Sequence, residues 1–167
     1  MVTYDVWAIV ALAVLLLCIQ RAAGTALVFR GTRVITCPET GQAAAVGLSL
    51  WPAALSSLFR KPVLRVEKCS RWPEARSCDH GCVKQIGSSP SGTLASSIVA
   101  RWCRGKSCVC CGVPLARVHV TGRRPYLLTD ERKFLGWKDI PPQNLPKVLE
   151  TSGPVCWTCL MAETHTW

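Results

Sequence analysis

The stretch CVCCGVP, residues 108–114, contains the first of two CxxC pairs in the chain, and CWTC at residues 156–159 is the second. In a CxxC turn two thiolates can bind one ion, while backbone N–H groups of the turn bond to the sulfurs. A glycine directly after the second cysteine, here Gly112, lets the chain fold back close to that ion. Two such turns supply the four thiolates of a tetrahedral structural zinc site. We therefore predict a zinc site with four ligands, Cys108, Cys111, Cys156 and Cys159.

The two pairs are separated by 44 residues, which is long for a minimal zinc ribbon. We expect residues 117–146 to form an inserted hairpin that brings the two pairs together. Four thiolates do not by themselves distinguish zinc from iron, so an iron–sulfur cluster is the alternative cofactor. A thioredoxin-like redox site is not indicated, because neither pair lies in a βαβ pattern.

Four further cysteines form a second, less regular set. One lies in the turn sequence CPETG (37–41), and three lie in CSRWPEARSCDHGC (69–82). This spacing is not a familiar zinc pattern, and His80 could replace one of the thiolates. The set is a second candidate metal site, which would bring the chain to two zinc ions, with the ligands Cys37, Cys69, Cys78 and Cys82. Of the remaining cysteines, Cys18 suits a small apolar position. Cys103 and Cys110 are left over, although Cys110 lies inside the first CxxC turn and could substitute for one of its thiols.

Residues 6–19 (VWAIVALAVLLLCI) contain no charged residue, glycine or proline. With Tyr4 near one rim and Arg21 at the other, the span reaches about 17 residues, the lower limit for crossing a bilayer core. A cleaved signal peptide begins with basic residues, but this chain begins MVTYD. A buried core helix needs protein on every side, which a chain of 167 residues hardly supplies. We predict a membrane anchor over residues 1–30, with the signal peptide and the buried helix as alternatives.

All twenty Lys and Arg residues lie after position 20, so basic residues follow the apolar segment and none precedes it. The positive-inside rule then predicts a single-pass protein of the inner (cytoplasmic) membrane with residues 31–167 in the cytoplasm. Cytoplasmic thiols stay reduced, which favours metal ligands over disulfides. The ten cysteines outside the anchor are an even number, so five disulfides are the alternative for a body outside the cytoplasm.

Strand-like segments at 32–36 and 42–50 flank the turn at 37–41, which predicts a hairpin, and residues 63–67 predict another strand. Apolar residues at helical spacing predict a helix over 93–102. Shorter helices are predicted over 77–86 and 145–150, and residues 121–140 suit a surface loop or hairpin.

Residues 87–92 (GSSPSG) have the composition of a flexible linker. This linker would divide the cysteine-rich body into possible sub-lobes at 31–86 and 93–167. The predicted fold is a single N-terminal transmembrane helix followed by a small, irregular α+β, zinc-ribbon-like cysteine-rich domain.

The sequence contains no HExxH, GxSxG or GxxxxGK[ST] motif. Its one acidic pair, Asp130-Glu131, precedes Arg132-Lys133, which predicts a charged turn rather than an acid–base site. We therefore expect a non-enzymatic protein. The net charge of +10 comes from dispersed basic clusters, which favours anionic lipid or an acidic protein surface as partner over nucleic acid.

Three segments, TCPETGQAAAV (36–46), CSRWPEARSC (69–78) and PVCWTC (154–159), resemble a family of small, uncharacterised bacterial membrane-anchored cysteine-rich proteins. The likeness covers most of the body after the anchor. It implies one integrated metal-binding domain with two cysteine clusters, and it implies no activity. Cys103 and Cys110 are extra to the family's pattern.

These features together predict an accessory subunit of a larger integral membrane complex. One helix would lie in the bilayer against that complex, and the metal-containing body would cover its cytoplasmic face. The alternatives are a membrane-tethered iron–sulfur electron carrier and a zinc-ribbon adaptor that binds nucleic acid.

Overall fold

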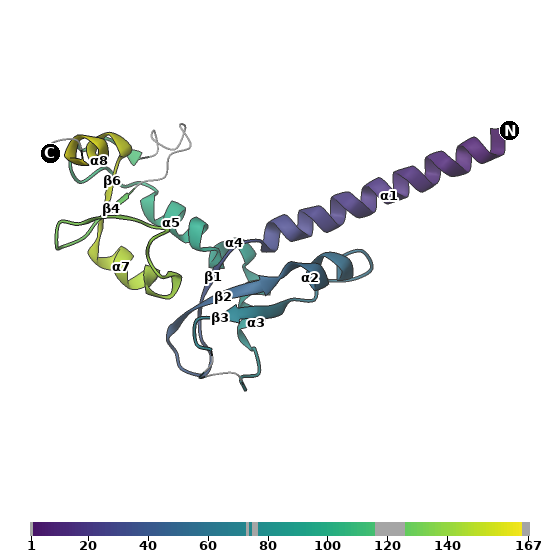
Figure 1. Cartoon of the computed structure of the whole chain (residues 1–167), viewed down its shortest axis with the longest axis horizontal. Helices are drawn as coiled ribbons and strands as arrows, with labels where there is room; N and C mark the ends of the chain where they lie inside the picture. The colour runs from purple at the N-terminus through teal and green to yellow at the C-terminus, as the bar shows by residue number, and fades with distance from the viewer. Residues whose placement is uncertain (1, 73, 75–76, 116–125, 165–167) are drawn as a thin grey trace.

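The computed structural model describes residues 2–72, 74, 77–115 and 126–164. One long helix projects from a body that contains two three-stranded sheets and several short helices (Figure 1). The expected division into an apolar N-terminal helix and a small α+β body is confirmed. The zinc-ribbon-like character of that body stays a prediction.

Helix α1 (Val2–Phe29) is continuous over 28 residues and therefore extends well beyond the apolar segment at 6–19. Residues 22–29 are mostly small and apolar and include no proline, so they continue the helix. Within it, Val6–Phe29 is 24 residues long, and none of its most apolar window is buried. At about 1.5 Å per residue this segment is about 36 Å long. It is long and apolar enough to cross a hydrocarbon core of about 30 Å.

Arg33 joins α1 to the body. Its side chain is fully buried, and its guanidinium donates hydrogen bonds to the backbone carbonyls of Val28, Arg30 and Pro90. The last carbonyls of a helix have no intrahelical partner and carry partial negative charge, so a cation stabilises them. The sequence indicated Arg33 only as a flanking positive charge. The structure shows that this residue also caps the C-terminus of α1.

The first sheet has three antiparallel strands in the order β1-β2-β3, with bounds β1 (Arg33–Thr36), β2 (Ala43–Ser49) and β3 (Arg65–Cys69). The predicted hairpin is confirmed, with Arg33 opposite Val46 and Thr36 opposite Ala43. The third strand begins two residues later than predicted. Helix α2 (Leu50–Ser56) follows β2 and contacts α1 (Figure 1).

Three helices connect the two sheets, with bounds α3 (Cys82–Ser88), α4 (Pro90–Thr93) and α5 (Ala95–Cys103). The helix predicted over 77–86 therefore begins five residues late, and the one predicted over 93–102 is confirmed. The expectation of a flexible linker at 87–92 was wrong, because α3 and α4 occupy most of it. Thr93 is buried, and the Ala95 N–H donates to the Thr32 carbonyl at 3.1 Å, which fixes this connection against the start of β1.

Strand β1 contributes to two apolar cores, because successive side chains of a strand point to opposite faces. Ile35 packs in a core with Phe29, Val46 and Ile86. Val34 packs in the other core, whose remaining residues come from α5 and from elements after it.

The second sheet is antiparallel with the order β5-β4-β6, and its strands are β4 (Tyr126–Leu128), β5 (Phe134–Gly136) and β6 (Gly153–Val155). Three helical segments follow β5 or β6, namely η2 (Pro142–Asn144), α7 (Leu145–Thr151) and α8 (Trp157–Thr164). The hairpin expected within 121–140 is confirmed as β4–β5, and the helix expected over 145–150 as α7. Residues 117–125 of the expected insertion lie outside the described residues.

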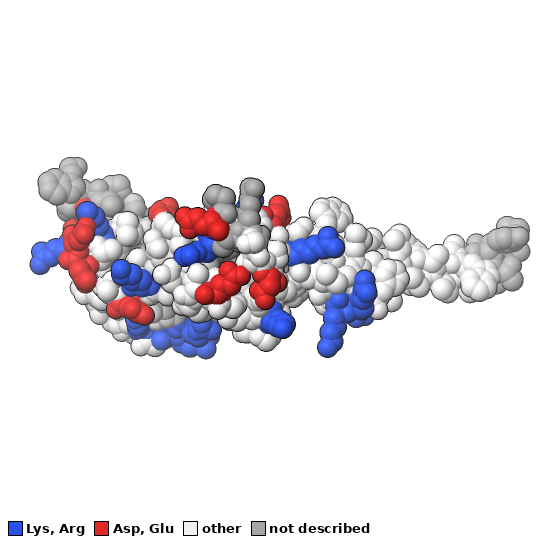
Figure 2. Space-filling model, turned by 90° about the horizontal axis from the view of Figure 1, so that it is seen from below, with Lys and Arg blue, Asp and Glu red and all other residues white. Residues whose placement is uncertain are grey.

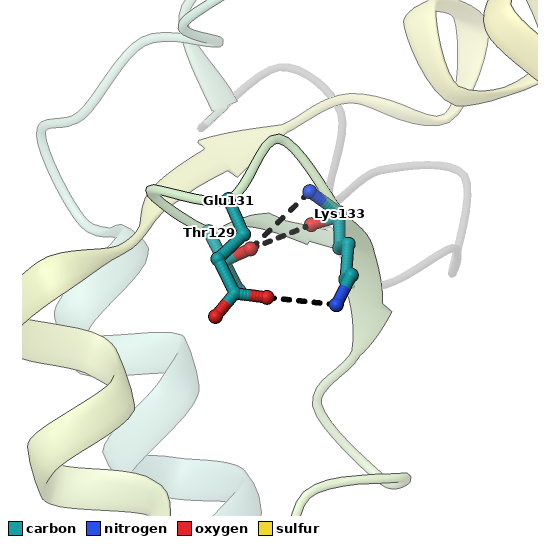
Figure 3. A network of polar contacts seen from close by, with 3 residues as sticks. All are labelled: Thr129, Glu131 and Lys133. Atoms are coloured by element: carbon teal, nitrogen blue, oxygen red, sulfur yellow. Dashed lines mark hydrogen bonds and ion pairs between the residues drawn. The ribbon is translucent and has the colours of Figure 1, made fainter.

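The turn between β4 and β5 is the predicted charged turn (Figure 3). The Thr129 hydroxyl accepts a hydrogen bond from the Lys133 N–H, and the Lys133 ammonium pairs with Glu131 at 2.7 Å. Both charged side chains are exposed, so the pair belongs to the surface of the turn. This partner lowers the pKa of Glu131 and raises the pKa of Lys133.

Replacing Arg33 by Ala should lower the free energy of unfolding by about 2–4 kcal/mol, because three backbone carbonyls lose a charged donor. Arg30→Ala is the matched control, since the Arg30 side chain is exposed and only its carbonyl contacts Arg33. The control should change stability by no more than about 0.5 kcal/mol. Denaturant unfolding of the full chain in detergent, followed by tryptophan fluorescence, measures both values. Equal stabilities for the two variants would show that Arg33 is not a structural cap.

Candidate metal centre

The first CxxC pair lies in a tight turn. The Cys108 N–H donates to the Val113 carbonyl, and the Gly112 N–H donates to the Cys108 carbonyl, both at 2.9 Å. Gly112 has a φ of +72°, a left-handed conformation that side chains other than glycine rarely adopt. An antiparallel bridge between Ser107 and Pro114 closes the turn. Gly112 therefore lets the chain turn back after the second cysteine, as the sequence predicted.

The second pair spans the end of β6 and the first turn of α8. Cys156 follows β6, and Cys159 lies three residues later, so the two side chains come to the same side of the helix. The Val109 N–H donates to the Pro154 carbonyl at 3.0 Å, which ties the first turn to β6. Gly153 allows this approach, because a Cβ atom there would lie 2.5 Å from Val109 Cγ1.

The four predicted ligand atoms converge. The Sγ atoms of Cys108, Cys111, Cys156 and Cys159 all lie within 4.8 Å of one another. The Cys111 and Cys156 sulfurs are 3.7 Å apart. Zinc–sulfur bonds of about 2.3 Å in a tetrahedron place sulfurs about 3.8 Å apart, so this group fits a single metal ion. A disulfide requires about 2.05 Å, and all eleven cysteines are free.

Backbone N–H groups surround the sulfur of Cys108. The Cys156 N–H donates to it at 3.3 Å, and the N–H groups of Cys111 and Cys110 also bond to it. Burial acts to raise the pKa of Cys108, but these N–H groups outweigh burial and lower that pKa to about 6. Cys108 therefore ionises more readily than an ordinary cysteine thiol.

The pKa of Cys159 moves the opposite way. Burial raises it, and the sulfurs of Cys111, Cys156 and Cys108 raise it further. Four thiolates at this separation repel one another, so all four can lose their protons only if a cation lies between them. The donor set thus suits a divalent metal ion with affinity for sulfur.

Two cysteines without an assigned role lie outside the group of four. Cys103 is buried among apolar residues at the end of α5, and burial raises its pKa to about 11. It therefore packs as a small apolar side chain. Cys110 lies inside the first turn, but the sulfurs that converge are those of the other four cysteines, so it does not take the place of a ligand.

The second predicted set converges less tightly. Cys37, Cys69, Cys78 and Cys82 all line one small cavity of about 20 Å³ together with His80. Burial raises the pKa of Cys82, and the charges of the other three cysteines raise it further. The Thr40 hydroxyl and N–H, together with the Glu39 N–H, lower the pKa of Cys37. Among the described residues, only the first set has all its ligand atoms within 4.8 Å.

The sequence did not reveal how closely the first turn packs against β6. The contact of Val109 with Gly153 depends on residues 44 positions apart that carry no metal-binding pattern of their own. The only signal in the sequence was the glycine just before the Pro-Val-Cys segment. The structure shows why a glycine is required there, because Val109 lies too close to Gly153 for a Cβ atom.

No known protein family matches the chain, and no curated protein or solved structure matches it either. The resemblance to a bacterial family therefore stays a prediction. The apolar N-terminal helix and the cysteine cluster are the features of that resemblance that the structure contains.

Gly153→Ala should weaken metal binding about tenfold, because the added methyl group displaces Val109 and with it the first turn. The double variant with Val109→Ala should restore affinity, since the displaced side chain is then removed. Competition with a chromophoric zinc chelator measures both affinities. If the double variant still bound zinc weakly, the loss of affinity would not come from the contact between Val109 and residue 153.

Proposed function

We propose that this protein is a non-enzymatic accessory subunit of a larger integral membrane complex, with a cytoplasmic body that contains a structural zinc ion. The observation that carries the proposal is α1, which exposes apolar side chains on every side and continues directly into the folded body. A helix that is apolar all round needs lipid or another protein around it. A single anchored helix attached to a small body is typical of a subunit that docks beside other membrane helices.

Helix α2 and the turn after it support a body held close to the bilayer. Trp51, Leu55 and Phe59 are 77%, 57% and 91% exposed, although all three are large and apolar. They belong to a segment that lies beside the C-terminal part of α1 (Figure 1). Arg60 and Lys61 follow directly and suit the phosphate groups of anionic lipid. This arrangement is that of an interfacial helix beside a transmembrane one.

Basic residues at the body end of α1 support a cytoplasmic body. Arg21 lies eight residues before Phe29, about 12 Å along the helix, and Arg30 follows the helix. Both side chains are exposed and could reach the lipid head groups on one side of the membrane. A cytoplasmic location would keep the cysteines reduced and available for metal.

The four-cysteine group supports a structural ion rather than a catalytic one. A catalytic zinc site keeps one position open for water or substrate, whereas this group already supplies four thiolates. The short distances between sulfurs also favour one ion over a cluster, because the four thiolates of an iron–sulfur cluster are divided among two or four irons and therefore lie farther apart. We therefore propose zinc, with a single iron ion as the chemical alternative.

The charge distribution supports an acidic protein surface or anionic lipid as the partner. On the face of the body shown in Figure 2, Lys and Arg side chains occupy separate places, with Asp and Glu between them. Nucleic acid binding favours a continuous basic face, so this mixed surface supports it less.

Purification of the tagged full chain from membranes in mild detergent tests the subunit proposal. We expect stoichiometric integral membrane partners that stay bound at moderate salt. Salt weakens only the charge interactions of the body, whereas α1 would also pack against partner helices in the bilayer. The same tag on a chain with α1 replaced by an unrelated transmembrane helix is the control, and it should lose most of these partners. A lone monomer that binds DNA in a salt-dependent way would overturn the proposal.

Elemental analysis of the purified protein tests the nature of the metal. We expect zinc and a colourless solution, because zinc has a filled d shell. Cys111→Ser combined with Cys159→Ser should remove the ion bound by the first set. A coloured protein that contains iron would support the electron carrier instead.

A further inference from the structure

The turn at Cys37 has the same backbone hydrogen bonds as the metal-binding turn at Cys108. The Cys37 N–H donates to the Gln42 carbonyl and the Gly41 N–H to the Cys37 carbonyl, both at 2.8 Å. These bonds join the same relative positions as those from Cys108 to Val113 and from Gly112 to Cys108. The glycines also correspond, with φ values of +67° for Gly41 and +72° for Gly112.

The sulfur of Cys37 lies in the same kind of environment as that of Cys108. Backbone N–H groups two and three residues later, from Glu39 and Thr40, bond to it. The corresponding groups of Cys110 and Cys111 bond to Cys108. Such N–H groups stabilise a thiolate ligand and orient it toward a metal. Thr40 takes the place of the second cysteine, so further ligands must come from other segments.

We propose that Cys37, Cys69, Cys78 and Cys82 bind a second zinc ion through four thiolates. Three segments bring the required cysteines to the turn. Cys69 ends β3, Cys82 begins α3, and Cys78 lies in the loop between these elements. All four line one cavity of about 20 Å³, large enough for a single ion or water molecule and too small for a cluster.

Two side-chain contacts hold these segments around the turn. The Gln85 amide accepts from the Thr36 N–H at 3.1 Å and donates to the Thr36 carbonyl at 3.3 Å, which fixes α3 beside the end of β1. Arg71 donates to the Gln42 side chain at 2.8 Å, which fixes the end of β3 beside the turn. The cavity therefore has walls held together by groups other than the cysteines, and a bound metal would draw the four sulfurs that line it together.

His80 also lines this cavity, but its ring already packs edge-on against Trp72 at a centroid distance of 6.3 Å. Its backbone is in a left-handed conformation with a φ of +56°, which a local turn imposes. The four thiolates are thus the ligand set, and His80 packs beside them.

The metal content of the reduced full chain in detergent tests the second site. After loading with zinc and desalting, we expect two ions per chain in the unmodified protein. Cys37→Ser combined with Cys82→Ser should leave one ion, as should Cys111→Ser combined with Cys159→Ser. Cys110→Ser, which changes an exposed cysteine outside both sets, is the matched control and should keep two. A single ion in the unmodified protein, unaffected by the first double variant, would overturn the proposal.

A second measurement needs no variant and so does not depend on whether one folds. Cys37, Cys69 and Cys78 are partly exposed and should react with iodoacetamide after metal removal, whereas zinc should protect them. Equal modification with and without zinc, or a disulfide within this set, would contradict the second site. His80→Ala should leave the thiolate-to-cobalt absorption of the cobalt-substituted protein unchanged, and a loss would contradict the four-thiolate set. The subunit proposal is tested separately, because none of these results depends on membrane partners.

Discussion

Mutual repulsion among four thiolates is the constraint on which the C-terminal half of the body depends. Two of these cysteines, Cys108 and Cys156, belong to the apolar core formed by α5, β4, α7 and β6. Core residues are held in place by close packing, so these two sulfurs cannot separate to relieve the repulsion without opening the core. A bound cation turns this repulsion into attraction and joins β6 and α8 to the turn at Cys108. A small body with short strands gains most from such a link, because its apolar core alone is limited.

The connection between α1 and the body depends on the buried guanidinium of Arg33. The guanidinium of Arg33 meets only carbonyl groups, from the end of α1 and from Pro90, and no carboxylate. Its Nη1 and Nη2 atoms donate to these carbonyls, whereas the buried Nε has no partner among the described residues. The partial negative charge at the helix C-terminus stabilises the buried cation. Because Arg33 is also the first residue of β1, it fixes the direction of α1 relative to the first sheet. The exposed apolar side chains of α2 then come to lie along α1 rather than at a distance from it.

Local patterns in the sequence predicted the elements that depend on local forces. The hairpin at 32–50 and the helices at 93–102 and 145–150 follow from the alternation of side chains, from spacing and from turn residues such as Gly41. The convergence of the two CxxC pairs was predictable because their chemistry requires a shared ion. Arg33 was misjudged in part, since burial of an arginine against helix carbonyls leaves no pattern in sequence. Residues 87–92 were misjudged because their Gly and Ser content resembles a linker, whereas they lie between the buried residues Ile86 and Thr93 in two short helices that contact β1.

The two cysteine sets differ in how many of their ligands are neighbours in the sequence. In the first set each CxxC turn holds two ligands close together, so only one long loop must close to complete the site. In the second set only the turn at Cys37 is local, and the other ligands come from the end of β3, a loop and the start of α3. Each additional segment adds to the entropy cost of loop closure. The hydrogen bonds of Gln85 and Arg71 offset part of this cost, because they hold two of the segments beside the turn. The second set therefore depends on the first sheet for its geometry, whereas a metal ion on the two CxxC pairs would itself link β6 to the turn at Cys108.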